Sequence, residues 1–184
     1  MKKLFNPIAH FDERKLLAVG LASVVLNLGL SYFFGFKMIS ILKFAPSASG
    51  SGVLAFYILR AYAVAIAALY LYGLLINRKT RFLDIVNTVL IAIIPAILVN
   101  PIQKIPVFAK ILERMLKAPL EVLPADLTMM LLLALVMLPF IVYKIVLLLN
   151  GFKTATHLKA WYHVVLFFVI LLAIASFTPY IFKL

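Results

Sequence analysis

Five long apolar stretches constrain this chain more than any other feature of its sequence. A helix needs about 20 consecutive apolar residues to cross the hydrocarbon core of a bilayer. Stretches of that length cover residues 16–36, 53–76, 82–100, 127–149 and 162–182. We therefore predict an all-α fold, a polytopic membrane helix bundle with five transmembrane helices. The first stretch is too long for the apolar region of a signal peptide, so we expect it to be retained as a helix.

The composition supports the same environment. Hydrophobic residues make up 66% of the chain and charged residues 13%, which is too little polar side chain to cover a soluble core. The connectors between the apolar stretches are all shorter than about 40 residues, the length below which a domain seldom folds unaided. We expect one membrane domain that covers residues 1–184.

Basic residues predict the orientation of the helices. The net charge of +12 comes from Lys and Arg at the ends of the apolar stretches, which favours contact with anionic headgroups over nucleic acid. With the N-terminus in the cytoplasm, ten basic residues fall on the inner side and seven on the outer side. The dense basic turn at residues 77–81 agrees with this bias, so we predict a cytoplasmic N-terminus and an external C-terminus.

One connector has a clear amphipathic pattern. Residues 107–118 place apolar side chains on one helical face and charged side chains on the other, which predicts an interfacial helix parallel to the membrane. This helix either covers the bundle or docks a partner, and the candidate partner-docking face is Phe108, Ile111, Leu112 and Met115. The apolar run 37–44 is expected to lie along the same interface.

Polar residues within the apolar stretches are candidate site residues because burying them in hydrocarbon is costly. In the first stretch Gly20, Ser23, Asn27 and Ser31 share one helical face, which predicts close helix packing or, as the alternative, a polar conduit. The candidate intramembrane polar residues are Asn27, Arg60, Asp84 and Lys144.

From the sequence, each of the charged candidates has more than one possible contact. Arg60 could extend outward to the headgroups, or pair with Asp126 or Asn100. Asp84 and Lys144 are expected at a similar depth near the cytoplasmic side and could form an ion pair. Alternatively, Asp84 caps the start of the third stretch while Lys144 extends to the surface independently.

The sequence offers no recognisable catalytic or metal centre. It contains no cysteine, and its three histidines are not spaced with a carboxylate in a pattern that binds metal. We expect no catalytic residue, cofactor, metal, nucleic-acid partner or small-molecule substrate. Asn150-Gly151 is a typical helix C-cap pair and predicts the end of the fourth helix.

Two segments resemble a known family. The first runs from Tyr143-Lys144 through Asn150-Gly151-Phe152-Lys153-Thr154-Ala155-Thr156-His157-Leu158-Lys159-Ala160-Trp161, and the second is Phe5-Asn6-Pro7. Together with the five-helix plan they are similar to the bacterial branch of the Yip1 family. The resemblance implies a small protein of the bacterial cytoplasmic (inner) membrane that contacts other membrane proteins or lipids. The Asp-Leu-Tyr-Gly-Pro-type motif of the eukaryotic members is absent here.

Three classes of function follow from these features. The first is a non-enzymatic accessory or scaffold subunit for other integral membrane proteins or for lipids. The second is a small transporter or channel, motivated by Asn27, Arg60, Asp84 and the prolines within two of the helices. The third is a membrane enzyme, for which the six carboxylates and three histidines offer no recognisable acid–base pair. We expect the first.

The predicted topology can be tested with single cysteines, because the chain has none of its own. A cysteine at Ser49 should react with a membrane-impermeant maleimide added to intact cells, and one at Thr80 should react only after the cells are opened. The reverse pattern would invert every span.

Overall fold

A computed structural model describes residues 2–46, 50–99, 101–102, 105, 107, 110–111 and 124–181. Within these residues five helices are long and apolar enough to cross a membrane, which confirms the predicted all-α membrane bundle. They are α2 (Glu13–Phe34), α3 (Ser51–Ile76), α4 (Phe82–Val99), α6 (Pro124–Thr156) and α7 (Trp161–Phe177). Shorter elements at the ends of the chain are α1 (Lys2–Phe5), η1 (Pro7–Ala9) and η4 (Thr178–Tyr180).

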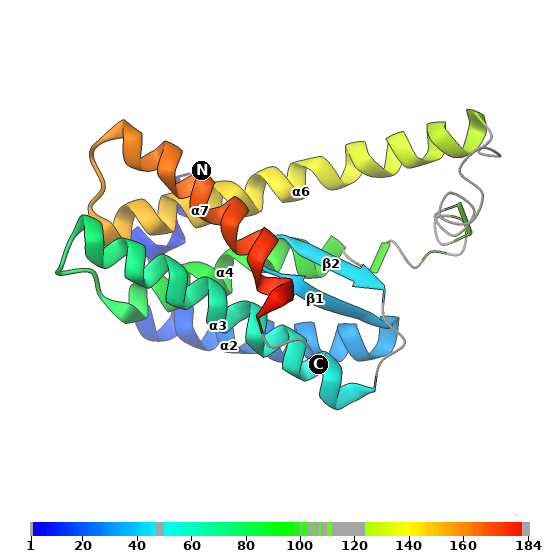
Figure 1. The fold of residues 1–184 in the computed structure, drawn as a ribbon, viewed down its shortest axis with the longest axis horizontal. Coiled ribbons are helices and arrows are strands. Elements are labelled where there is room, and N and C mark those ends of the chain that lie inside the picture. The colour runs from blue at the N-terminus through cyan, green and yellow to red at the C-terminus, as the bar shows by residue number, and fades with distance from the viewer. Residues whose placement is uncertain are drawn as a thin grey trace.

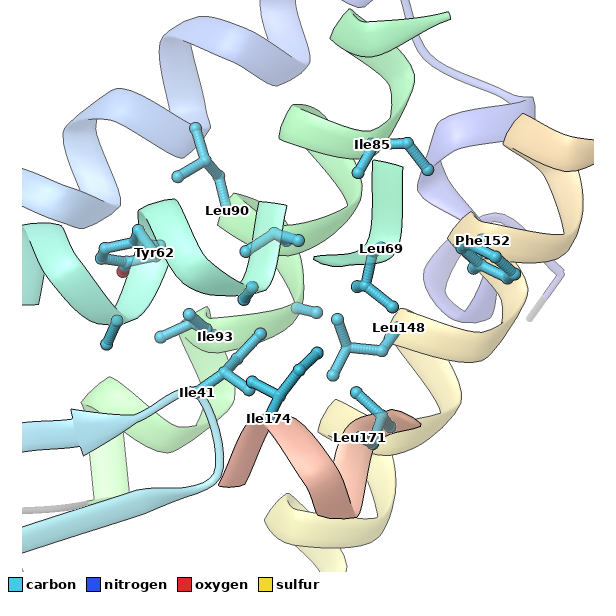
Figure 2. Packing of buried hydrophobic residues seen from close by; sticks show 14 of the residues in the cluster. Ile41, Tyr62, Leu69, Ile85, Leu90, Ile93, Leu148, Phe152, Leu171 and Ile174 are labelled. Atoms are coloured by element: carbon cyan, nitrogen blue, oxygen red, sulfur yellow. The ribbon is translucent and has the colours of Figure 1, made fainter. Parts of the chain in front are cut away.

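Helix α4 lies at the centre of the bundle (Figure 1). It packs against α2, α3 and α6, and α7 packs against α3. Most side chains of α4 are buried, whereas α2, α3 and α6 each leave an apolar face exposed. Figure 2 shows the core at the meeting point of these helices, with Ile93 of α4, Leu148 of α6 and Ile174 of α7 directed toward one another.

Small and polar residues form the buried face of α2. Its buried residues are Leu16, Gly20, Ser23, Asn27 and Ser31, all on one side of the helix. Gly20 faces Leu90 of α4, and the Ser23 hydroxyl donates to the carbonyls of Gly20 at 2.7 Å and Leu90 at 3.3 Å. The absence of a large side chain at Gly20 lets the two helices approach closely, as in other membrane helix pairs.

A β-hairpin follows α2 and enters the bundle. Gly35 ends α2 with φ 60°, a left-handed conformation that glycine adopts without steric cost. Strands β1 (Phe36–Ser40) and β2 (Lys43–Pro46) then pair antiparallel, with a bulge between Met38 and Ser40. Figure 2 shows the turn of the hairpin reaching the core at Ile41. The prediction that run 37–44 lies along the membrane interface is therefore wrong.

Helix α6 is longer than expected. It continues through Asn150-Gly151 to Thr156, and the left-handed residue that follows it is His157, with φ 52°. Gly151 is instead a site of close packing, because a Cβ atom there would lie 2.6 Å from the side chain of Thr88. At the other end, α6 extends away from the remaining helices (Figure 1), and its side chains Leu131 and Leu135 are 71% and 67% exposed.

The predicted interfacial helix 107–118 lies mostly outside the described residues. Within it, residues 107, 110 and 111 are helical, and Ile111 is buried. Phe108, Leu112 and Met115 belong to the part that the structure does not describe, so the docking face stays a prediction.

Gly20→Ala should weaken the contact between α2 and α4. A Cβ atom at this position would lie 2.8 Å from the Leu90 Cβ, and overpacking of this kind costs about 1–3 kcal/mol. We expect a lower melting temperature of the detergent-solubilised protein, read by a thermal-shift or aggregation assay. Gly29→Ala is the matched control, since an added Cβ there meets nothing within 4 Å. Equal melting temperatures for the two variants would contradict this packing.

Candidate functional site

The hairpin brings backbone groups that need hydrogen-bond partners into the apolar interior of the bundle. Backbone N–H and C=O groups in an apolar interior must be hydrogen-bonded, because there is no water to bond them. A two-stranded hairpin pairs its strands with each other, but a bulge and a turn leave some carbonyls without a strand partner. Met38 and Ile41 are fully buried, so the carbonyls near them need partners from the helices.

Arg60 of α3 bonds to the bulge of the hairpin. The register pairs Met38 with Phe44 and Ser40 with Lys43, which leaves Ile39 without a partner residue. The Arg60 guanidinium donates from Nη2 to the Ile39 carbonyl at 3.4 Å and from Nη1 to the Ile181 carbonyl at 3.0 Å. Arg60 thereby links the hairpin to the end of the last helix.

Aromatic rings also lie beside the guanidinium of Arg60. Its guanidinium carbon lies 4.6 Å from the centre of the Tyr57 ring, a cation–π distance. Arg60 is only 6% exposed. The guanidinium therefore lies within the bundle and does not extend outward along the surface.

Lys144 of α6 bonds to the turn of the hairpin. Its ammonium donates to the carbonyl of Ile41 and lies 5.4 Å from the centre of the Phe44 ring. The side chain is 3% exposed, so Lys144 does not reach the surface either. The two buried cations thus bond to two successive irregular points of the same hairpin, the bulge and the turn.

The expected ion pair between Asp84 and Lys144 is not formed in the described part of the chain. Near the start of α4, an ion pair at the surface joins Arg81 to Glu13. Asp84 lies in the first turn of α4, where a carboxylate interacts favourably with the helix dipole. This arrangement matches the alternative in which the two groups act independently, except that Lys144 is buried.

Asn27 joins α2 to the hairpin and to α3. Its Nδ2 lies 3.6 Å from the sulfur of Met38 and 3.5 Å from the hydroxyl of Tyr62, and its Oδ1 accepts from Ser31 at 3.4 Å. Asn27 is fully buried. Its polar groups are directed at packing partners, which is the role expected of a polar residue between membrane helices.

A cavity of about 330 Å³ lies beside the hairpin. Its walls come from the turn and β2, from the end of α4 and from the middle of α6; they include Phe44, Ala96, Met137, Phe140, Ile141 and Lys144. Phe140 and Ile141 are exposed, so the cavity opens toward the surface that faces lipid. Sequence reasoning found Lys144 but no signal for the cavity around it.

The described residues contain no group of three or more His, Asp or Glu side chains arranged to hold a metal ion. The chain is therefore characterised by its five-helix plan and by its sequence. Residues 9–181 match the sequence profile of the Yip1 domain. The chain belongs to the Yip1 family. No curated protein and no solved structure shows significant similarity to it.

The two segments that carry the family resemblance lie against each other. The carbonyl of Phe5 accepts from the Asn150 amide at 2.9 Å, and the Asn6 amide donates to the Thr154 hydroxyl at 2.9 Å. The Tyr143 hydroxyl donates to the carbonyl of Leu4, also at 2.9 Å. The N-terminal segment is therefore held along α6 by three polar side chains of that helix.

Some residues of the β-hairpin could have been found from the sequence. Gly35 interrupts the apolar pattern, and Phe36, Met38 and Ser40 follow it at a spacing of two, with buried and partly buried side chains alternating along β1. Alternation of this kind is a strand signal. The carbonyls of Ile39 and Ile41 gave no signal, because the identity of a side chain does not reveal which backbone group lacks a partner.

Replacing Arg60 should loosen the hairpin. Arg60→Met removes the donors to Ile39 and Ile181, and each buried carbonyl left unbonded costs about 1–3 kcal/mol. We expect a lower melting temperature in detergent and faster proteolysis of residues 36–46. The control is Arg78→Met, which removes an exposed guanidinium from the α3–α4 turn. If both variants unfold like the unmodified protein, Arg60 does not anchor the hairpin.

Proposed function

We propose that this Yip1-family protein is a non-enzymatic accessory or scaffold subunit that acts through contacts with other membrane proteins or lipids. The observation that carries the proposal is the use of its buried polar residues. Asn27, Arg60 and Lys144 all bond to neighbouring elements of the same bundle. Polar groups used in this way stabilise an internal arrangement and are not arranged as a recognisable acid–base pair.

The alternative, a small transporter or channel, would need these polar groups along a pathway. Transporters of known architecture place polar groups at the midplane between repeated halves. Here Asn27 packs against Met38 and Tyr62, and Arg60 bonds to two backbone carbonyls. This geometry favours the scaffold over the pathway.

The exposed half of α6 is the surface that we propose for contact with another membrane protein. Leu131 and Leu135 lie on a part of the helix that extends beyond the bundle (Figure 1). Phe108, Leu112 and Met115 form the second proposed docking face, whereas Ile111, which the sequence placed with them, is buried. A helix of a partner could pack along α6 with the van der Waals contacts that drive helix association in lipid.

We infer that the protein resides in the bacterial cytoplasmic membrane with a cytoplasmic N-terminus, as a single membrane domain. In the structure α1 and η1 lie against α6, and Glu13 at the start of α2 pairs with Arg81 in the basic turn. The basic turn and the N-terminus thus share one end of the bundle, which supports their location on the same side. Gly50 and Lys79 are exposed, whereas Thr80 is buried, so Gly50→Cys and Lys79→Cys are the better pair for the labelling test.

Co-purification tests the scaffold role. The protein is extracted in a mild detergent at native expression, and the proteins bound to it are identified by mass spectrometry. We expect a stable heteromeric complex that is lost in the double variant Leu131→Ala, Leu135→Ala. The matched control is Leu71→Ala, Leu75→Ala, which shortens two exposed leucines of α3 and should keep the complex.

Two results would contradict the proposal. One is a protein that purifies alone and supports substrate-dependent flux in liposomes, which would favour the transporter. The other is a complex that both double variants lose equally, which would mean that α6 is not the contact surface.

A further inference from the structure

The cavity beside the hairpin combines an apolar wall with a buried positive charge. Lys144 lines the cavity and is 3% exposed. An ammonium has three donors, and in the described part of the chain the hydrogen bond that it makes is the one to the Ile41 carbonyl. The packing of the hairpin therefore uses one of three donors on a charge that is almost completely removed from solvent.

An opposite charge would stabilise an ammonium that is buried in this way. Removing an ammonium from water costs several kcal/mol unless a counter-ion compensates it. The ion pair between Arg81 and Glu13 is elsewhere in the bundle, and Asp84, the nearest candidate from the sequence, does not pair with Lys144. Nothing in the described part of the chain neutralises Lys144.

The rest of the cavity suits an acyl chain. Met137, Phe140 and Ile141 form the α6 wall and Ala96 the α4 wall. The opening lies at the exposed side chains of Phe140 and Ile141, on the surface that faces lipid. Its volume of about 330 Å³ is at the lower end of the range of about 300–1,000 Å³ that is typical of small-molecule sites. Lys43, which is exposed, adds a second cation at the opening.

We propose that this cavity binds an anionic lipid, with its anionic group on Lys144 and its acyl chain along the α6 wall. The anion is a carboxylate or a phosphate, and a free fatty acid or an anionic phospholipid can supply it. This inference deepens the lipid part of the proposed function and rests on it. It does not depend on a protein partner, so failure of the co-purification test leaves it standing.

Fluorescence quenching can detect this lipid. Trp161 is the single tryptophan of the chain and is exposed, so Trp161→Phe combined with Phe140→Trp places one reporter at the cavity. The full chain is reconstituted in phosphatidylcholine vesicles. Three brominated probes are then added in separate titrations: a fatty acid, phosphatidylglycerol and phosphatidylcholine.

We expect saturable quenching by an anionic probe beyond that caused by brominated phosphatidylcholine. Quenching by the fatty acid alone identifies a free carboxylate as the ligand, and quenching by phosphatidylglycerol alone identifies a lipid phosphate. Equal quenching by all three probes would overturn the proposal, because it would show an ordinary lipid-facing surface.

Variants of Lys144 test the charge. Lys144→Met should weaken the apparent affinity for the anionic probe by about tenfold or more, the loss expected for one charge-assisted hydrogen bond. Lys144→Arg keeps the charge and should keep the preference for the anion. Lys153→Met is the matched control, since it removes a partly exposed lysine from the same helix. An unchanged affinity in Lys144→Met would show that this lysine serves only the hairpin.

A second variant tests the cavity without touching Lys144. Ala96→Phe fills the space between α4 and α6 and should abolish the additional quenching by the anionic probe. Ala67→Phe is its control, because it adds the same ring to an exposed position of α3. Ala96→Phe decides the question even if Lys144→Met fails to fold. Quenching that survives in Ala96→Phe would place the lipid elsewhere.

Discussion

Backbone hydrogen bonding within an apolar interior is the constraint on which this structure depends. A helix satisfies its own backbone groups, but a hairpin of two short strands does not. The carbonyls at its bulge and its turn belong to Ile39 and Ile41, and they accept from Arg60 and Lys144. The two costly cations and the irregular hairpin are therefore parts of one arrangement, in which each stabilises the other.

Close approach of the helices makes room for this arrangement. Hydrophobic burial does not drive helix association in lipid, so contact between small residues becomes decisive. Gly20 brings α2 against Leu90, and Gly151 brings α6 against Thr88, so both neighbours are held closely to α4. The outer half of α6 has no such contacts in the described residues, and its apolar side chains are exposed. The same helix thus joins the core at one end and has exposed apolar side chains at the other.

The sequence predicted the helices well because hydrocarbon thickness sets their length, and five apolar stretches of that length are visible in the chain. It also placed Gly20, Ser23, Asn27 and Ser31 on one face, since that follows from helical periodicity alone. It was wrong about residues 37–44. That run is short and apolar, as an interfacial segment is. Buried and partly buried side chains nevertheless alternate along β1, with Phe36, Met38 and Ser40 on the buried side. It ended the fourth helix at Asn150-Gly151, where glycine serves close packing and α6 continues to Thr156.

By itself the sequence determined the membrane environment, the five helices and the Yip1-like segments, because these depend on composition and on patterns within short stretches. Only the tertiary structure decided what the charged residues contact. Lys144 was expected near Asp84 from a similar depth in the membrane, but depth does not specify the direction in which a helix face points. The hairpin brings the Ile41 carbonyl to Lys144, and that contact depends on how α2, α4 and α6 pack around it. The partner of a buried charge is a property of this packing, which no local pattern of residues encodes.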